Sequence, residues 1–226
     1  MDEIVTMIKD CEQEIEQALV SHEQAEQLDE ALEAYHKAEE KLTKLALDPE
    51  HPAYKEQQRV LAYCWMRQAN ILRQLGQIQQ ASLLSQKEIE AARASGDDLT
   101  LARSAMSFGL ASILNGNNEE GISYLDEARN LFERKSSYDY QQGLGWYWIL
   151  QADLINHGLL SDSQEQAVEA ASRALDLLQP LENWPGIARA YGARAEAYEK
   201  LNRLDEVRAD REAQARNEQK VILHSD

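Results

Sequence analysis

Residues 26–38 read EQLDEALEAYHKA, and this stretch contains the pattern that decides the fold. Ala31 and Ala38 are small residues seven positions apart, so they lie two turns apart on one face of a helix. Leu28 and Tyr35 stand on the same side and extend an amphipathic stripe. Small residues on an apolar face let a second helix approach closely. The stretch therefore predicts one half of a closely packed helix pair.

The same spacing recurs along the chain, each time after a residue of a type that often ends a helix. A small or β-branched residue stands five positions after the turn residue at Ala31, Ala81, Gly121 and Val207. The turn residues Gly76, Gly116, Gly158 and Asn202 follow one another at steps of 40, 42 and 44 residues. Glycine and asparagine favour the left-handed conformation that ends many helices. A nearly constant period of this length is typical of a stacked helical array.

Composition and periodicity favour helix along the whole chain. Ala, Leu, Glu and Gln dominate, whereas the residues that favour strands are scarce. We expect ten helices in five antiparallel pairs within a single domain that spans 1–226. The predicted pairs and a C-terminal tail cover 1–47, 53–95, 98–135, 138–180, 185–220 and 221–226.

The first helices of the pairs add a pattern of large, small and large side chains. It is found at Trp65, Ala69 and Leu72, and again at Tyr191, Ala195 and Tyr198. Together with the turn residues, this pattern resembles the tetratricopeptide (TPR) repeat, in a form with a period of about 40 residues rather than about 34. The resemblance covers nearly the whole chain. It implies an all-α fold, a right-handed α-solenoid whose TPR-like superhelix has a concave groove lined by the first helix of each pair.

The net charge of the chain limits the classes of partner that it is expected to bind. The formal net charge is −17 and the pI is about 4.7, which disfavours nucleic acid and anionic membranes because both require basic surfaces. A basic or neutral protein partner is compatible with it. We find no run of about 18 apolar residues and no secretory signal pattern. We therefore expect a cytoplasmic protein.

Motifs for chemistry are missing from the sequence. The five histidines have no metal-ligand spacing, and neither a Gly-rich phosphate loop nor a G-x-S-x-G elbow occurs. Cys11 and Cys64 fall in apolar helical stretches, which predicts buried thiols. We therefore expect no catalytic residues, no metal site, no cofactor and no enzyme activity.

The resemblance directs attention to one face of the first helices, which it places in the groove. This face combines arginines with methionines and a tryptophan, residue types that often anchor a partner. A peptide with apolar anchors and at least one acidic group fits this mixture. The predicted groove residues are Tyr63, Met66, Arg67, Asn70, Arg73, Arg103, Met106, Leu110, Trp148 and Ile149.

The first helix of the predicted pair 138–180 allows two registers. If Trp148, Ala152 and Ile155 form its large, small and large pattern, Trp148 packs inside and Trp146 and Asp153 face the groove. The other register exposes Trp148.

We interpret the chain as a scaffold that binds a protein or a peptide. Two alternatives stay open. The apolar residues of the first helix, Ile4, Val5, Met7 and Ile8, could form a homodimer interface, which would make the chain a self-associating structural protein. The longer repeat is also typical of bacterial peptide-sensing regulators, which would here act with a separate output protein.

Overall fold

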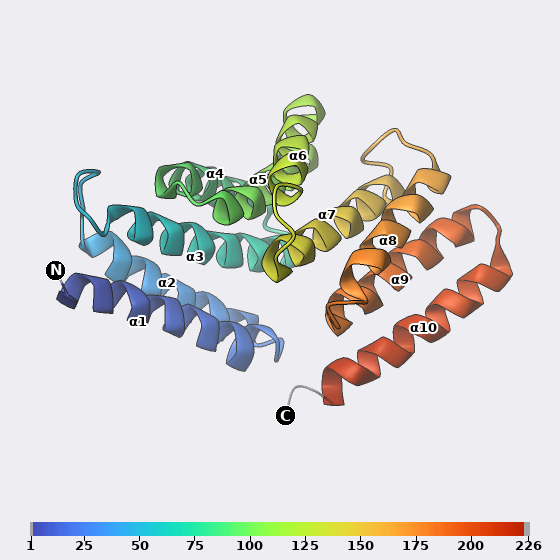
Figure 1. Ribbon diagram of the computed structural model, residues 1–226, viewed down its shortest axis with the longest axis horizontal. Helices are drawn as coiled ribbons and strands as arrows, with labels where there is room; N and C mark the ends of the chain where they lie inside the picture. Colours follow the sequence, from blue (N-terminus) through green and yellow to red (C-terminus); the bar gives the residue numbers. More distant parts are fainter. Residues whose placement is uncertain (1, 224–226) are drawn as a thin grey trace. The chain divides into compact units, whose positions relative to one another are not determined.

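The computed structural model describes residues 2–223, and within them the chain is helical with no strand (Figure 1). The all-α prediction is confirmed, and each of the ten predicted helices is found within a few residues of its expected bounds. The α-helices are α1 Asp2–Ala18, α2 Leu28–Lys44, α3 Tyr54–Gln74, α4 Ile78–Ser95, α5 Asp98–Leu114, α6 Asn118–Phe132, α7 Tyr138–Asn156, α8 Gln164–Leu178, α9 Trp184–Lys200 and α10 Leu204–Leu223.

The helices end where the sequence predicts left-handed residues. Gly76, Gly116 and Gly158 have φ of 72°, 84° and 68°, and Asn202 has φ of 56°. The predicted start of α8 is also confirmed. The Ser163 hydroxyl oxygen accepts a hydrogen bond from the Gln166 backbone amide, and the Ser163 backbone amide donates one to Oε1 of Gln166, which forms a capping box.

The contacts divide the chain into two compact units, and each is described by itself. The N-terminal unit comprises Met1–Ala128 and the C-terminal unit comprises Arg129–Asp226. The boundary falls inside α6.

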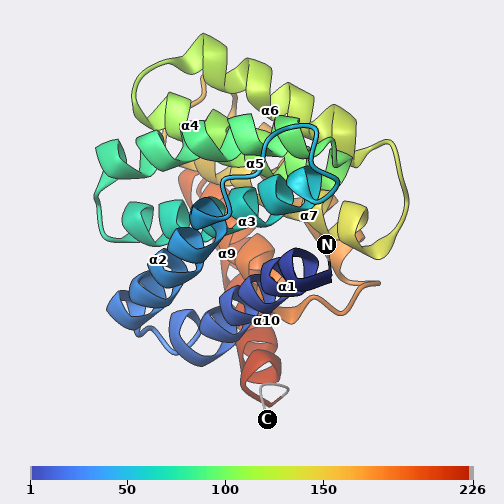
Figure 2. The same ribbon diagram turned by 90° about the vertical axis from the view of Figure 1, so that its left-hand side faces the viewer.

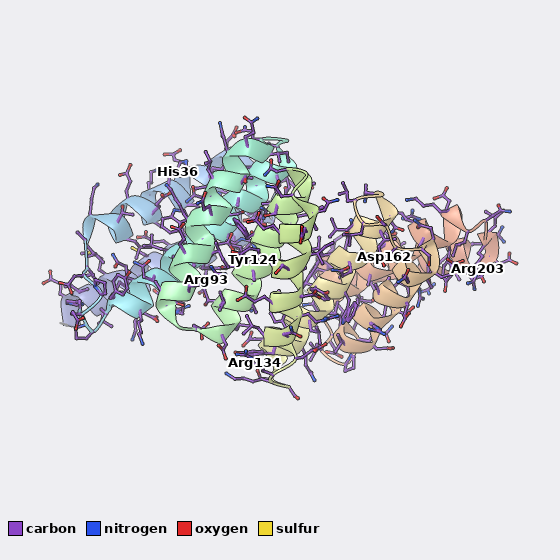
Figure 3. All side chains as sticks on the ribbon, turned by 90° about the horizontal axis from the view of Figure 1, so that it is seen from above. His36, Arg93, Tyr124, Arg134, Asp162 and Arg203 are labelled. Atoms are coloured by element: carbon purple, nitrogen blue, oxygen red, sulfur yellow. The ribbon has the colours of Figure 1, made fainter. Side chains whose placement is uncertain are left out.

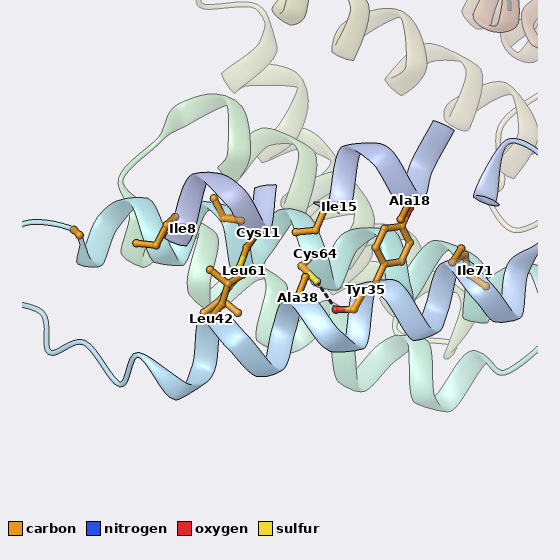
Figure 4. Packing of buried hydrophobic residues seen from close by; sticks show 13 residues of the cluster. Ile8, Cys11, Ile15, Ala18, Tyr35, Ala38, Leu42, Leu61, Cys64 and Ile71 are labelled. Atoms are coloured by element: carbon orange, nitrogen blue, oxygen red, sulfur yellow. Dashed lines mark hydrogen bonds between the residues drawn. The ribbon is translucent and has the colours of Figure 1, made fainter. Parts of the chain in front are cut away.

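In the N-terminal unit, α1, α2 and α3 share one apolar core (Figure 4). Figure 2 shows α1 beside α2. Cys11 and Cys64 are both free and buried, as the sequence predicts. The Cys64 thiol donates a hydrogen bond of 3.2 Å to the carbonyl oxygen of Tyr35, and burial raises its pKa to about 12. The main core residues are Ile8, Cys11, Ile15, Tyr35, Ala38, Leu42, Leu61, Cys64 and Ile71.

The next hairpin of this unit depends on two glycines. An ideal Cβ at Gly121 on α6 would lie 2.5 Å from Cγ1 of Ile113 and 2.7 Å from the carbonyl oxygen of Gly109 on α5. The two backbones therefore approach as closely as glycine permits. Arg93 on α4 lies beside Tyr124 on α6 and donates a hydrogen bond of 3.3 Å to its hydroxyl group (Figure 3).

One element was not predicted. After Ala18 the chain continues through a five-residue π-helix, η1 (Leu19–Glu23). A π-helical turn is wider than an α-helical one and often occurs where a side chain has a special position. Here it carries Glu23, whose carboxylate reaches Tyr35 on α2 and Arg67 on α3.

The C-terminal unit contains the end of α6 and the helices α7 to α10, and α7, α8 and α9 each pack against the helix that follows. Its core is rich in alanine, so the helices lie close together. Gly145 on α7 lies at one such close approach, because a Cβ there would lie 2.5 Å from Cγ of Leu178 on α8. Arg194 on α9 forms a two-pronged ion pair with Asp210 on α10, at 2.7 and 2.8 Å.

Candidate functional site

A small pocket opens between α1, α3 and α5 of the N-terminal unit. It has a volume of about 150 Å³. It combines residues of three helices that are far apart in sequence, and three of them, Tyr63, Met66 and Arg103, belong to the predicted groove. We call it the α1–α3–α5 pocket, and its lining residues are Glu12, Glu16, Arg59, Ala62, Tyr63, Met66, Thr100, Arg103 and Ser104.

The apolar wall of the pocket comes from α3. Ala62, Tyr63 and Met66 follow one another at steps of one and three residues, so they share one face of the helix. Ala62 is fully buried, whereas Tyr63 and Met66 are partly exposed. Burial raises the pKa of Tyr63, so its hydroxyl group stays neutral at physiological pH. This wall can receive an apolar group.

The polar rim contains an ion-pair network. Arg59 donates hydrogen bonds to Glu56 at 2.8 Å and to Glu12 at 2.6 Å. These bonds raise the pKa of Arg59, Glu56 contributing most, so the guanidinium group is permanently charged. Glu16 lies one turn beyond Glu12 on α1 and is exposed. Two arginines and two glutamates line the pocket, so their formal charges cancel and leave no excess of positive charge to bind the predicted acidic group.

Arg67, a predicted groove residue, is engaged inside the unit. Its guanidinium group forms a two-pronged pair with Glu23 of η1, with Nε at 3.1 Å from Oε2 and Nη2 bonded to Oε1. The Tyr35 hydroxyl group donates a third hydrogen bond of 2.7 Å to Glu23. The side chains of Arg67 and Glu23 are only 18% and 8% exposed. Glu23 therefore ties η1 to α2 and α3, and the pair leaves little of Arg67 for a partner.

Arg73 and Asn70 also belong to an internal network. Arg73 donates hydrogen bonds to Asn70 at 2.5 Å, to Ser107 at 3.1 Å and to Ser85 at 3.2 Å. Ser107 in turn donates to the buried carboxylate of Glu88 at 2.8 Å. Burial lowers the pKa of Arg73, and the charge of Glu88 partly offsets this. The network joins α3, α4 and α5.

The remaining predicted residues divide between the two units. Met106 and Leu110 on α5 are partly buried in the N-terminal unit. Trp148 and Ile149 lie on α7 in the C-terminal unit. Ile149 is 2% exposed and packs in the core with Ala174 and Leu178, so its side chain offers no surface to a partner, contrary to the predicted groove position.

Trp148 follows the first of the two registers. It packs against the cluster that contains Ala152 and Ile155, and Arg173 on α8 lies 4.6 Å from its ring. Asp153 faces α9 and forms an ion pair of 2.7 Å with Arg189. The Trp148 indole group therefore packs between α7 and α8. This geometry does not support the predicted position of Trp148 in the groove.

Comparisons with known proteins complete the description of the fold. Searches with protein family models and among curated proteins found no match. Solved structures do match. The crystal structure of BtubC (BKLC) from P. vanneervenii is similar over 96% of this chain and 92% of that one, with a TM-score of 0.59 and 14% sequence identity. TPR-like repeats of a chain from Podosopora anserina, described as a putative kinesin light chain, match over 92% of this chain and 95% of that one, with a TM-score of 0.52 and 17% identity.

The fold is TPR-like. At these identities the likeness concerns the fold alone, and it confirms the resemblance drawn from the turn residues and the small residues. Helical repeats of this kind generally serve protein interaction. In the TPR-like arrangement, α1, α3 and α5 are the first helices of successive pairs. The α1–α3–α5 pocket is therefore lined by first helices.

Several residues of this TPR-like pocket were missed by the sequence analysis. Arg59 lies one turn before Tyr63 on the same face of α3, so extending the helical pattern backwards would have found it. Glu12 and Glu16 were missed because α1 was considered only for its apolar stripe. Thr100 and Ser104 carry no signal in sequence that separates them from ordinary helix residues.

Two searches of the described residues had negative results. Histidine, cysteine, aspartate and glutamate form no group of three or more that is placed to hold a metal ion within the part of the chain that the structure describes. No helix among the described residues is long and apolar enough to span a bilayer.

A second, larger cleft of about 530 Å³ lies on other helices of the N-terminal unit. It runs between α2 and α4, and its apolar members include Leu32, Leu84 and the exposed Leu83. Glu90 stands at its rim. The sequence analysis did not select this surface.

Proposed function

We propose that this chain is a non-enzymatic scaffold that binds a protein or a peptide through the first helices of its repeats. The observation that carries the proposal is the α1–α3–α5 pocket, which gathers Tyr63, Met66 and Arg103 from two first helices beside the carboxylates of a third. Aromatic, methionine and arginine side chains are common anchors of protein interfaces. The TPR-like fold supports the same class of function.

The size of the pocket favours a peptide over a small metabolite. Sites for small molecules usually enclose about 300–1,000 Å³, whereas this pocket encloses about 150 Å³. That volume suits one side chain of a longer ligand that lies across the helices. Peptide binding in this form requires no cofactor.

The self-association alternative has less support. Of the four apolar residues on which it rests, Ile8 is fully buried and Ile4 and Val5 pack against the core. Met7 is 39% exposed, which is a small area for a stable interface. The regulatory alternative uses the same pocket and differs only in requiring a separate output protein.

Site-specific cross-linking tests the proposal. A random peptide library is selected on the purified chain, and enriched peptides are then bound to two variants. One carries the photoreactive residue p-benzoylphenylalanine in place of Tyr63, and the other carries it in place of Leu83, which is 66% exposed on α4. We expect cross-linking at position 63 and little at position 83. Failure to enrich any peptide, or equal cross-linking at both positions, would overturn the proposal.

A further inference from the structure

The charges of the N-terminal unit identify a class of ligand. We infer that the α1–α3–α5 pocket takes a basic peptide, with a lysine or arginine side chain entering the pocket and its charged end near Glu16. This inference rests on the proposed function and names the partner class for the same site. It replaces the acidic group that the sequence suggested.

Net charge is concentrated in the unit that holds the pocket. Of the 40 acidic and 23 basic residues in the chain, 24 acidic and 11 basic residues precede Arg129, so the N-terminal unit has a formal charge of −13 out of −17. Fields of this sign raise the association rate of cationic ligands and repel anionic ones. An acidic peptide would have to approach against this field.

Two of the arginines that suggested an acidic ligand are held inside the unit by other residues. Arg67 is paired with Glu23, and Arg73 is held by Asn70, Ser85 and Ser107 beside Glu88. Neither lines the pocket. The positive charge of these two arginines therefore serves to join helices, whereas Arg103 lines the pocket.

The formal charges of the two arginines and two glutamates that line the pocket cancel, and Glu56 beside Arg59 adds a third carboxylate. Arg59 is shared by Glu12 and Glu56, so two carboxylates balance one guanidinium group. Glu16 is exposed and makes no ion pair with the residues that the structure describes. Burial is the main cause that raises the pKa of Tyr63, and the charge of the Glu16 carboxylate adds to the rise. Glu16 is thus an anion at the pocket that can accept a cation from a ligand.

The walls suit the stem of a long basic side chain. Lysine and arginine bury their methylene groups against apolar surface while the charged end stays with polar groups. Ala62 and Met66 supply that apolar surface, and Tyr63 adds an aromatic ring, a group that attracts cations. A volume of about 150 Å³ leaves room for one such side chain.

The experiment uses defined peptide mixtures on the full chain. Four fluorescent decamer sets carry Lys, Arg, Glu or Leu at the central position and the same mixture of neutral residues elsewhere. Binding is followed by fluorescence anisotropy at low and high NaCl concentrations. We expect the Lys and Arg sets to bind about tenfold more tightly than the Glu set, a difference that corresponds to about 1.4 kcal/mol. Salt should reduce this advantage.

A matched pair of variants locates the effect. Glu16→Lys and Glu90→Lys make the same change of charge at exposed glutamates of the same unit, one at the pocket and one at the cleft between α2 and α4. We expect Glu16→Lys to weaken binding of the Lys set about tenfold and Glu90→Lys to weaken it less than about twofold. Equal weakening would show that the charge of the whole unit, and not the pocket, attracts the peptide, and would overturn the inference.

The outcomes separate the inference from the proposed function. If the Leu or Glu set binds best and still cross-links at position 63, the scaffold function stands and the basic class is wrong. If none of the four sets binds and library selection also fails, the function falls together with the inference. Circular dichroism of both variants confirms that each has kept its helices.

Discussion

Ser107 on α5 donates a hydrogen bond of 2.8 Å to Oε2 of Glu88 on α4, inside the N-terminal unit. Glu88 is fully buried, and its Oε1 has no partner among the described residues. Burial raises the pKa of Glu88 to about 8, although Ser107, Arg73 and Ser104 each oppose the rise. At neutral pH this carboxyl group is therefore mostly protonated.

The buried carboxyl group should make the stability of the unit depend on pH. The pKa of Glu88 is about 8 in the folded chain and near the ordinary glutamate value of 4.5 in the unfolded chain. Between these values the folded state binds more protons, so its free energy of unfolding falls as pH rises, by up to about 1.4 kcal/mol per pH unit. Glu88→Gln should remove this fall and make the variant more stable than the wild type at pH 9. Urea unfolding at pH 5, 7 and 9 measures both effects.

Glu90→Gln is the control for this prediction, because Glu90 lies on the same helix and is exposed. It should keep the pH dependence of the wild type. Arg73 is the charged group whose charge affects the pKa of Glu88. An unchanged slope in Glu88→Gln would show that another group titrates.

The pair between Arg67 and Glu23 should contribute substantially to stability. Glu23→Gln removes the charge that balances Arg67 and weakens the acceptor of the Tyr35 hydroxyl group. Removing one member of a buried pair costs about 3–5 kcal/mol, and we expect about 2–3 kcal/mol because Arg67 is 18% exposed. Chemical denaturation gives the value. Glu33→Gln, in the exposed pair of Glu33 with Lys37, should cause no measurable change, and similar losses in both variants would contradict this account.

The sequence predicted the helices well because their ends carry explicit signals. Gly76, Gly116, Gly158 and Asn202 have the left-handed backbone that their residue types favour. Small residues such as Ala31 and Ala38 are fully buried where the helices approach. These signals are local, and a single sequence contains them in full.

The site was harder to predict because its residues depend on distant partners. Arg67 has the spacing of a groove residue on α3. Its side chain is instead engaged inside the unit because it binds Glu23, which lies 44 residues earlier in a π-helical turn. Ser85, Glu88 and Ala92 occupy one buried face of α4, so a careful helical pattern would have shown that Glu88 is internal. No such pattern reveals that Glu88 and Arg73 meet.

Close helix packing at Gly121 gives a third prediction. An added Cβ would meet the Gly109 carbonyl oxygen at 2.7 Å, and backbone atoms cannot move aside without separating α5 from α6. Gly121→Ala should therefore lower the free energy of unfolding by about 1–3 kcal/mol, despite the better helix propensity of alanine. Thermal unfolding followed by circular dichroism measures it.

Gly192 on α9 provides the contrasting substitution. A Cβ at Gly192 would meet only the end of the Gln214 side chain, at 3.2 Å or more, and that side chain can rotate away. Gly192→Ala should be neutral or stabilise the protein by up to about 1 kcal/mol. If both alanine variants lose stability alike, the backbone contact is not what distinguishes Gly121.

Charge reversal at two arginines should have different effects on folding and binding. Arg73→Glu removes the guanidinium group that binds Asn70, Ser85 and Ser107 and places a second buried acidic group beside Glu88, so we expect the N-terminal unit to lose its cooperative unfolding transition. Arg103 is partly exposed at the pocket, so Arg103→Glu should keep the fold. Because it makes the pocket more acidic, it should also bind lysine-centred peptides more tightly than the wild type. Thermal unfolding and fluorescence anisotropy give the two readouts. Weaker binding of those peptides by a folded Arg103→Glu variant would mean that Arg103 contacts an acidic group of the ligand, as the sequence first suggested.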